Sequence, residues 1–85
     1  MKYSRRSRRD IGEIITYIKD LISPKIRNRK ILDVDVANSL EISDGKLYSC
    51  KSRGVIPYDD IVYFCQKENL SIDELLLKAP VELNL

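Results

Sequence analysis

The chain has 85 residues, 44% hydrophobic and 33% charged, which is typical of one globular domain with a single core. It contains no apolar run of the roughly eighteen residues that a membrane helix needs. Its basic N-terminus lacks the apolar segment of a secretory signal. We therefore expect no membrane span, no secretory leader and a cytoplasmic protein.

The sequence offers few groups for catalysis or metal binding. It has two cysteines and no histidine, so a zinc site would lack ligands. We expect Cys50 and Cys65 to be reduced and partly buried, as small hydrophobic residues. No nucleophile–base arrangement and no glycine-rich phosphate loop is present. We therefore predict no enzyme, no cofactor, no metal and no small-molecule substrate.

Charge is distributed unevenly along the chain. Residues 1–30 carry ten basic and three acidic groups, a net +7, whereas residues 31–85 carry five basic and ten acidic groups, a net −5. The first nine residues are polar and basic without apolar periodicity, and we predict a flexible arm there. Its arginines, Arg5, Arg6, Arg8 and Arg9, can contact a polyanion. A solvated tail without such a role is the alternative.

An apolar stripe predicts a first helix, with Asp10 as its N-cap and Pro24 ending it at Ser23. The stripe recurs at helical spacing. It consists of Ile11, Ile14, Ile15, Ile18, Leu21 and Ile22. A basic connector, residues 24–30, follows and is long enough to hold a short turn of its own.

Two short helices are predicted next. Asp33 can cap a helix over residues 34–40, and Ser43 can cap another over residues 44–53. Gly54 stands where a helix end favours a left-handed residue.

The remaining signals predict two further helices. Pro57 suits the first turn of a fourth helix that Asn69 can end. The spacing in "SIDE" is typical of a capping box and predicts a fifth helix over residues 71–78. Residues 81–85 are a short strand, a tail or a linker to a missing region. We predict an all-α fold, a compact bundle of about five short helices over residues 10–80.

The second and third helices have the pattern of a helix-turn-helix. That motif needs a small residue where its helices cross and an apolar interior. Ala37 is the small residue. The interior positions are Val36, Leu40, Ile42, Leu47 and Cys50. A generic helical hairpin would satisfy some of this pattern.

A helical wheel of residues 44–53 places Gly45, Tyr48, Ser49 and Ser52 on the outer face. Lys46 and Arg53 lie on one flank, and Asp44 lies on the other. This small, hydroxyl-rich face with cations at its edge suits the major groove. We expect the hydroxyl groups to touch base edges and the cations to hold phosphates or a guanine. Gly45 permits close approach to DNA.

Residues 32–76, "LDVDVANSLEISDGKLYSCKSRGVIPYDDIVYFCQKENLSIDELL", resemble the helix-turn-helix domain of bacteriophage CI-type repressors, of the lambda-repressor-like fold. The most specific element is "RGVIP" after the third helix. Two residues depart from the family pattern: Glu41 replaces a glycine in the turn, and Cys50 replaces a tryptophan. If the turn needs a positive φ, Glu41 carries about 1 kcal/mol of strain.

The resemblance implies a repressor, usually dimeric, that binds double-stranded operators with two-fold symmetry and so associates with the nucleoid. The predicted DNA-binding residues are Ser43, Asp44, Gly45, Lys46, Tyr48, Ser49, Lys51, Ser52 and Arg53, together with Arg5, Arg6, Arg8 and Arg9. The alternative is a protein-interaction module that uses the acidic C-terminal half or a tail-mediated dimer. A third hypothesis is single-stranded nucleic acid or RNA binding through the arm alone.

Overall fold

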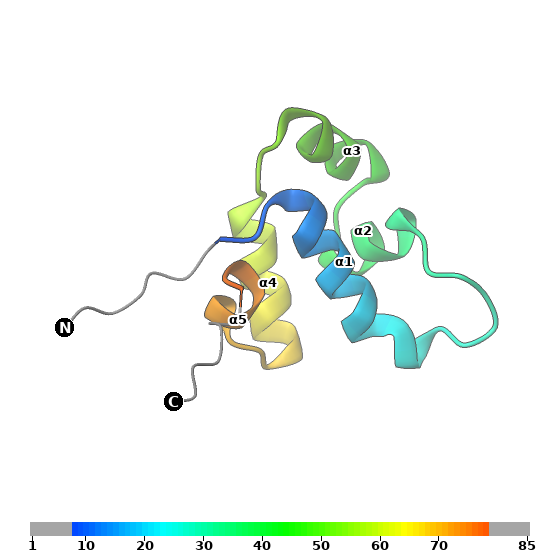
Figure 1. The fold of residues 1–85 in the computed structure, drawn as a ribbon. Coiled ribbons are helices and arrows are strands. Elements are labelled where there is room, and N and C mark those ends of the chain that lie inside the picture. Colours follow the sequence, from blue (N-terminus) through cyan, green and yellow to red (C-terminus); the bar gives the residue numbers. More distant parts are fainter. Residues whose placement is uncertain (1–7, 79–85) are drawn as a thin grey trace.

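The computed structural model describes residues 8–78, which form five α-helices and one 3-10 turn (Figure 1). The elements are α1 (Ile11–Ile22), η1 (Ser23–Lys25), α2 (Asp33–Leu40), α3 (Asp44–Arg53), α4 (Tyr58–Glu68) and α5 (Ile72–Leu76). The described residues contain no β-strand, only an isolated antiparallel bridge between Arg8 and Leu77. The predicted all-α bundle of short helices is therefore confirmed. Residues 1–7 of the predicted arm and the predicted tail, residues 81–85, lie outside the described residues.

Helix α1 begins at a capping box. The Asp10 carboxylate accepts a hydrogen bond from the Glu13 N–H at 2.8 Å, and the Glu13 carboxylate accepts one from the Asp10 N–H at 3.0 Å. The predicted stripe faces the core: five of its residues are buried and Leu21 is half-buried. The predicted N-cap and core face of this helix are thus confirmed, and the connector's predicted short turn is η1.

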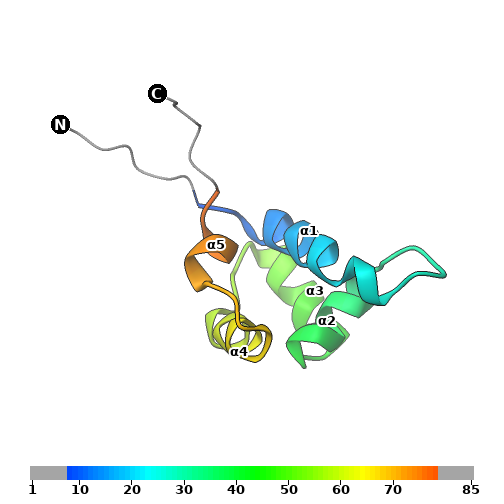
Figure 2. The ribbon, with the colours of Figure 1, turned by 90° about the horizontal axis from the view of Figure 1, so that it is seen from below.

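One core joins all five helices. Helix α1 packs against α2, α3 and α5, while α2 also packs against α3 and α4. In Figures 1 and 2, α4 and α5 occupy one end of the bundle, and the connector between η1 and α2 projects from the opposite end. The largest fully buried side chains are Phe64, Ile14, Ile18, Leu40, Leu47, Ile61, Leu75 and Val36. The shared core fixes α2 and α3 as parts of one unit.

The start of α2 differs from the prediction. Asp33 is the first residue of the helix rather than its cap, and Leu32 occupies the cap position. Leucine has no side-chain acceptor, so the cap depends on Asp35, whose carboxylate accepts the Leu32 N–H at 2.8 Å. Arg29 donates two further hydrogen bonds to that carboxylate, at 2.7 and 2.8 Å. Asp35 is the buried charged residue that ties the connector to α2.

The ends of α4 and α5 require two corrections. Pro57 lies just before α4 rather than in its first turn, while Asn69 ends α4 with a left-handed backbone as predicted. Helix α5 is shorter than residues 71–78, and no capping hydrogen bond from Ser71 is formed. It ends early because Leu77 adopts an extended conformation and pairs with Arg8.

Hydrogen bonds from Arg29, and then from the Leu32 N–H, lower the pKa of Asp35 to about 2. The ordinary value in an unfolded chain is about 3.9. Because the pKa is lower in the folded state, the ionised carboxylate stabilises the fold above about pH 4, and this contribution is lost as the pH falls toward 2. The variant Asp35→Asn keeps an acceptor for Leu32 but loses the charge.

We predict that wild type is more stable than Asp35→Asn at pH 6 and that the difference shrinks steadily between pH 5 and pH 2. Urea unfolding at several pH values measures it. Asp20→Asn is the matched control, because Asp20 is exposed and forms no ion pair with the described residues. A difference that does not change with pH would contradict the assignment.

Candidate nucleic-acid interface

Helices α2 and α3 are joined by a tight turn, residues 41–43. Glu41 ends α2 in the left-handed region, with φ 61° and ψ 41°. The Ile42 N–H then donates to the Ala37 carbonyl at 3.0 Å, which closes the turn on α2. Ala37 is fully buried, and the small side chain lets the two helices approach closely. Glu41 therefore has the positive φ that strains a non-glycine residue.

Contacts from α4 hold the strained residue. Lys67 places its ammonium 3.2 Å from the Glu41 carboxylate and 2.8 Å from the Ser39 carbonyl. The Tyr63 hydroxyl donates to the same carboxylate at 3.3 Å. A left-handed non-glycine residue costs about 1–2 kcal/mol. An exposed ion pair returns only about 0–1 kcal/mol, so the turn retains part of its strain.

Helix α3 has the predicted bounds and both predicted caps. The Ser43 hydroxyl accepts the Lys46 N–H at 3.0 Å, and Gly54 ends the helix with φ 68°. Leu47 and Cys50 are buried, as the helical wheel predicts. Tyr48 is 72% exposed, the most exposed of the large hydrophobic side chains described. One face of α3 therefore packs on the core while the other is open to solvent.

The predicted site residues at α3 are all at least partly accessible to solvent. Ser49 is half-buried and lies 3.5 Å from the Arg53 guanidinium. The remaining members of the set are exposed: Ser43, Asp44, Gly45, Lys46, Tyr48, Lys51, Ser52 and Arg53. A Cβ added at Gly45 would meet nothing nearer than the Ser43 hydroxyl at 4.0 Å.

Two of the three cations of α3 are engaged within the fold. Lys46 pairs with Asp60 of α4 at 2.5 Å, and that hydrogen bond raises the pKa of Lys46. Lys51 pairs with Asp33 at 2.6 Å, and Lys19 of α1 reaches the same carboxylate at 2.9 Å. Hydrogen bonds from these two lysines lower the pKa of Asp33.

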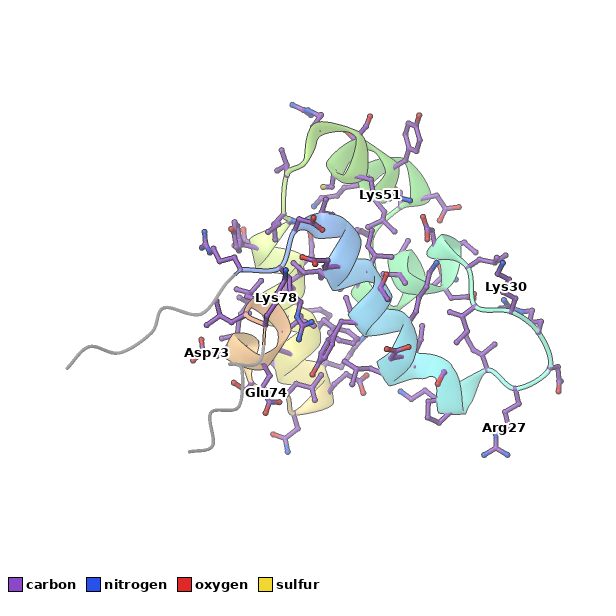
Figure 3. The ribbon with its side chains drawn as sticks, in the orientation of Figure 1. Arg27, Lys30, Lys51, Asp73, Glu74 and Lys78 are labelled. Carbon is purple, nitrogen blue, oxygen red and sulfur yellow. The ribbon has the colours of Figure 1, made fainter. Side chains whose placement is uncertain are left out.

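Sequence reasoning missed Lys19, Asp33 and Asp60 as neighbours of the candidate surface. The pairs join residues fourteen or eighteen positions apart on different helices, so no local spacing indicates them. Figure 3 shows Lys51 on α3, Lys30 on the connector, and Arg27 at the far bend of the connector pointing away from the helices.

The described part of the predicted arm is attached to the fold. The Arg9 N–H donates to the Leu76 carbonyl at 2.8 Å, and its guanidinium lies 4.2 Å from the centre of the Tyr17 ring. Arg8 is exposed and pairs with Leu77. Both residues thus lie beside α5, whereas Arg5 and Arg6 lie outside the described residues.

A small apolar hollow lies between the N-terminal ends of α2 and α3. Its volume is about 190 Å³, and its walls are Asp33, Val34, Asp44, Leu47 and Tyr48. A larger and more open hollow of about 540 Å³ runs along the exposed face of α1 between charged side chains. The smaller hollow is the one that adjoins the predicted site residues.

The cysteines are free and buried, on α3 and α4, and burial raises the pKa of the Cys65 thiol. Residues 8–78 contain no group of three or more histidine, cysteine or acidic residues placed to hold a metal ion. None of the helices described is both long and apolar enough to cross a bilayer.

Comparison of the chain with protein-family models, with curated proteins and with solved structures found no match. The assignment of a function therefore depends on the residues and geometry of the helix pair.

The strain at Glu41 can be measured with two variants that lose the same carboxylate. Only glycine adopts φ near +60° without strain, so we expect Glu41→Gly to be more stable than Glu41→Ala by about 1 kcal/mol in urea unfolding. Asn38 is exposed inside α2 and provides the control, since there alanine should be the more stable by a similar amount. Equal stabilities of the two Glu41 variants would refute a strained turn.

Proposed function

We propose that the chain is a sequence-specific double-stranded DNA-binding transcriptional regulator, a repressor of phage type, that inserts α3 into the major groove. The observation that carries the proposal is the open face of α3, held by the tight turn and by caps at both helix ends. Gly45 and Ser52 leave room on that face, and Tyr48 projects from it. A surface of this kind suits a groove about 12 Å wide.

The ion pairs of α3 are compatible with phosphate binding. Lys46 and Lys51 are 52% and 42% exposed, so their pairs with Asp60 and Asp33 contribute only about 0–1 kcal/mol each. A DNA phosphate can therefore replace either carboxylate as the partner of its lysine, or bind the lysine beside the carboxylate, at little cost. Arg53 forms no ion pair with the described residues and is available to a phosphate or a guanine.

The proposal extends to a homodimer on an operator with two-fold symmetry, in which each protomer reads one half-site. Such a protein acts in the cytoplasm on the nucleoid. Arg5 and Arg6 would add sequence-independent phosphate contacts.

A protein-interaction module is the second candidate. Helix α4 and the loop before it expose Val55, Tyr58 and Val62 by 48%, 44% and 41%. Tyr58 and Val62 are four positions apart and so share one face of α4. This face suits a protein contact.

A selection of random duplexes by the purified protein should recover an inverted repeat. On that site we expect Tyr48→Ala to lower the preference for the operator over a scrambled duplex by about tenfold. Tyr58→Ala is the matched control from α4 and should affect both duplexes alike. If selection enriches no sequence, the DNA-reading role fails and the protein-interaction module is favoured.

Replacing Gly45 distinguishes an effect on DNA binding from an effect on folding, because we expect the two to change in opposite directions. Alanine fits there without a clash, so we expect Gly45→Ala to stabilise the fold by up to about 1 kcal/mol. The added methyl group would nonetheless stand between α3 and the bases and weaken operator binding. Gly12 is the second residue of α1, as Gly45 is of α3, so Gly12→Ala is the matched control. Thermal unfolding and operator titration measure both effects, and unchanged operator affinity in Gly45→Ala would contradict close docking of α3.

A further inference from the structure

Asp44 is the acidic residue that α3 itself carries. Asp33 and Asp60 are paired with lysines, whereas none of the ion pairs or side-chain hydrogen bonds of the described residues involves the Asp44 carboxylate. The residue is exposed and is the first of α3. A free negative charge is therefore held at the N-terminal end of the helix proposed to enter DNA.

The N-terminal residues of a recognition helix are those that meet base edges. Phosphates repel a carboxylate, so its favourable partners in the major groove are the amino groups of cytosine and adenine. Adenine presents the N7 acceptor beside its amino group, and this acceptor repels a carboxylate oxygen. Cytosine has only carbon C5 beside its amino group, so it fits Asp44 better.

The apolar hollow adjoins this carboxylate. Asp44 forms part of its wall together with Asp33, Val34, Leu47 and Tyr48. Its volume of about 190 Å³ is well above the roughly 30 Å³ that a water molecule occupies in the liquid, so a methyl group fits. In a cytosine ring C5 is bonded to the carbon that carries the amino group. A base that meets Asp44 with its amino group from the side of the hollow therefore brings its C5 substituent to the hollow.

Building on the proposed function, we infer that Asp44 reads a cytosine in the major groove and that the hollow beside it receives the C5 position, so that 5-methylcytosine is bound more tightly than cytosine. Thymine carries the same methyl group but has the O4 acceptor in place of the amino group. Asp44 repels that acceptor. The expected order at this position is 5-methylcytosine, then cytosine, then thymine.

The test begins with selection of random duplexes by the full chain, followed by titration of the recovered site with each of the three bases at the assigned position. We expect cytosine to be preferred over thymine by about tenfold and methylation to tighten binding by about threefold to fivefold. Asp44→Asn should abolish the preference over thymine, because an amide can also donate to O4. Val34→Ala should abolish the methyl effect and keep the preference over thymine.

Asp73→Asn is the matched control, since it removes the same charge from α5, away from α3 (Figure 3). Circular dichroism establishes that each variant is folded. If no duplex is enriched, the proposed function itself fails. Two results would overturn the inference while DNA binding stands. In the first, a site is enriched but Asp44→Asn leaves its base preferences as unchanged as Asp73→Asn does. In the second, methylation weakens binding.

Discussion

The left-handed backbone at Glu41 is the constraint on which the placement of α3 depends. It reverses the chain at the end of α2 and allows Ile42 to donate back to Ala37. Glutamate is poorly suited to that conformation, and Lys67 and Tyr63 of α4 contact its carboxylate in return. The turn between α2 and α3 is thereby connected to a third helix, so the orientation of the exposed helix depends on tertiary contacts as well as on local sequence.

The charges around α3 also depend on contacts with other helices. The sequence has abundant cations, but the fold pairs three of the lysines near α3 with carboxylates. Asp33 holds one lysine from α1 and one from α3, and Asp60 holds Lys46. In the proposed complex with DNA, such a surface would attract phosphates weakly at a distance, and short-range contacts with bases would supply the specificity.

Local signals predicted most of the fold. The isoleucine stripe of α1, the caps Asp10, Ser43 and Gly54, and the end of α4 at Asn69 depend on spacing and backbone preferences that any chain segment expresses by itself. Predictions were less accurate where the structure depends on residues that are distant in the sequence. Asp33 was expected to cap α2, yet lysines from two other helices hold its carboxylate, and Asp35 satisfies the Leu32 N–H instead. A helical wheel of α3 predicts its open face. The hollow beside that face cannot be predicted from α3 alone, because residues of α2 form part of its wall.

The pairing of Arg8 and Arg9 with Leu76 and Leu77 has a consequence for the way the domain comes apart. The first and last described segments lie side by side, joined by the hydrogen bond from the Arg9 N–H to the Leu76 carbonyl and by the bridge between Arg8 and Leu77. Unfolding of one terminal segment therefore removes hydrogen-bond partners from the other, so the two segments unfold together rather than one after the other. The short helix α5 is too brief to persist by itself. It is held by Leu75 in the core, by packing against α1 and α4, and by the segment of Arg8 and Arg9 more than sixty residues earlier in the chain. Because the two ends of the described segment are adjacent, a short peptide can join them. The joined chain can then be opened at another loop without disturbing the helix pair.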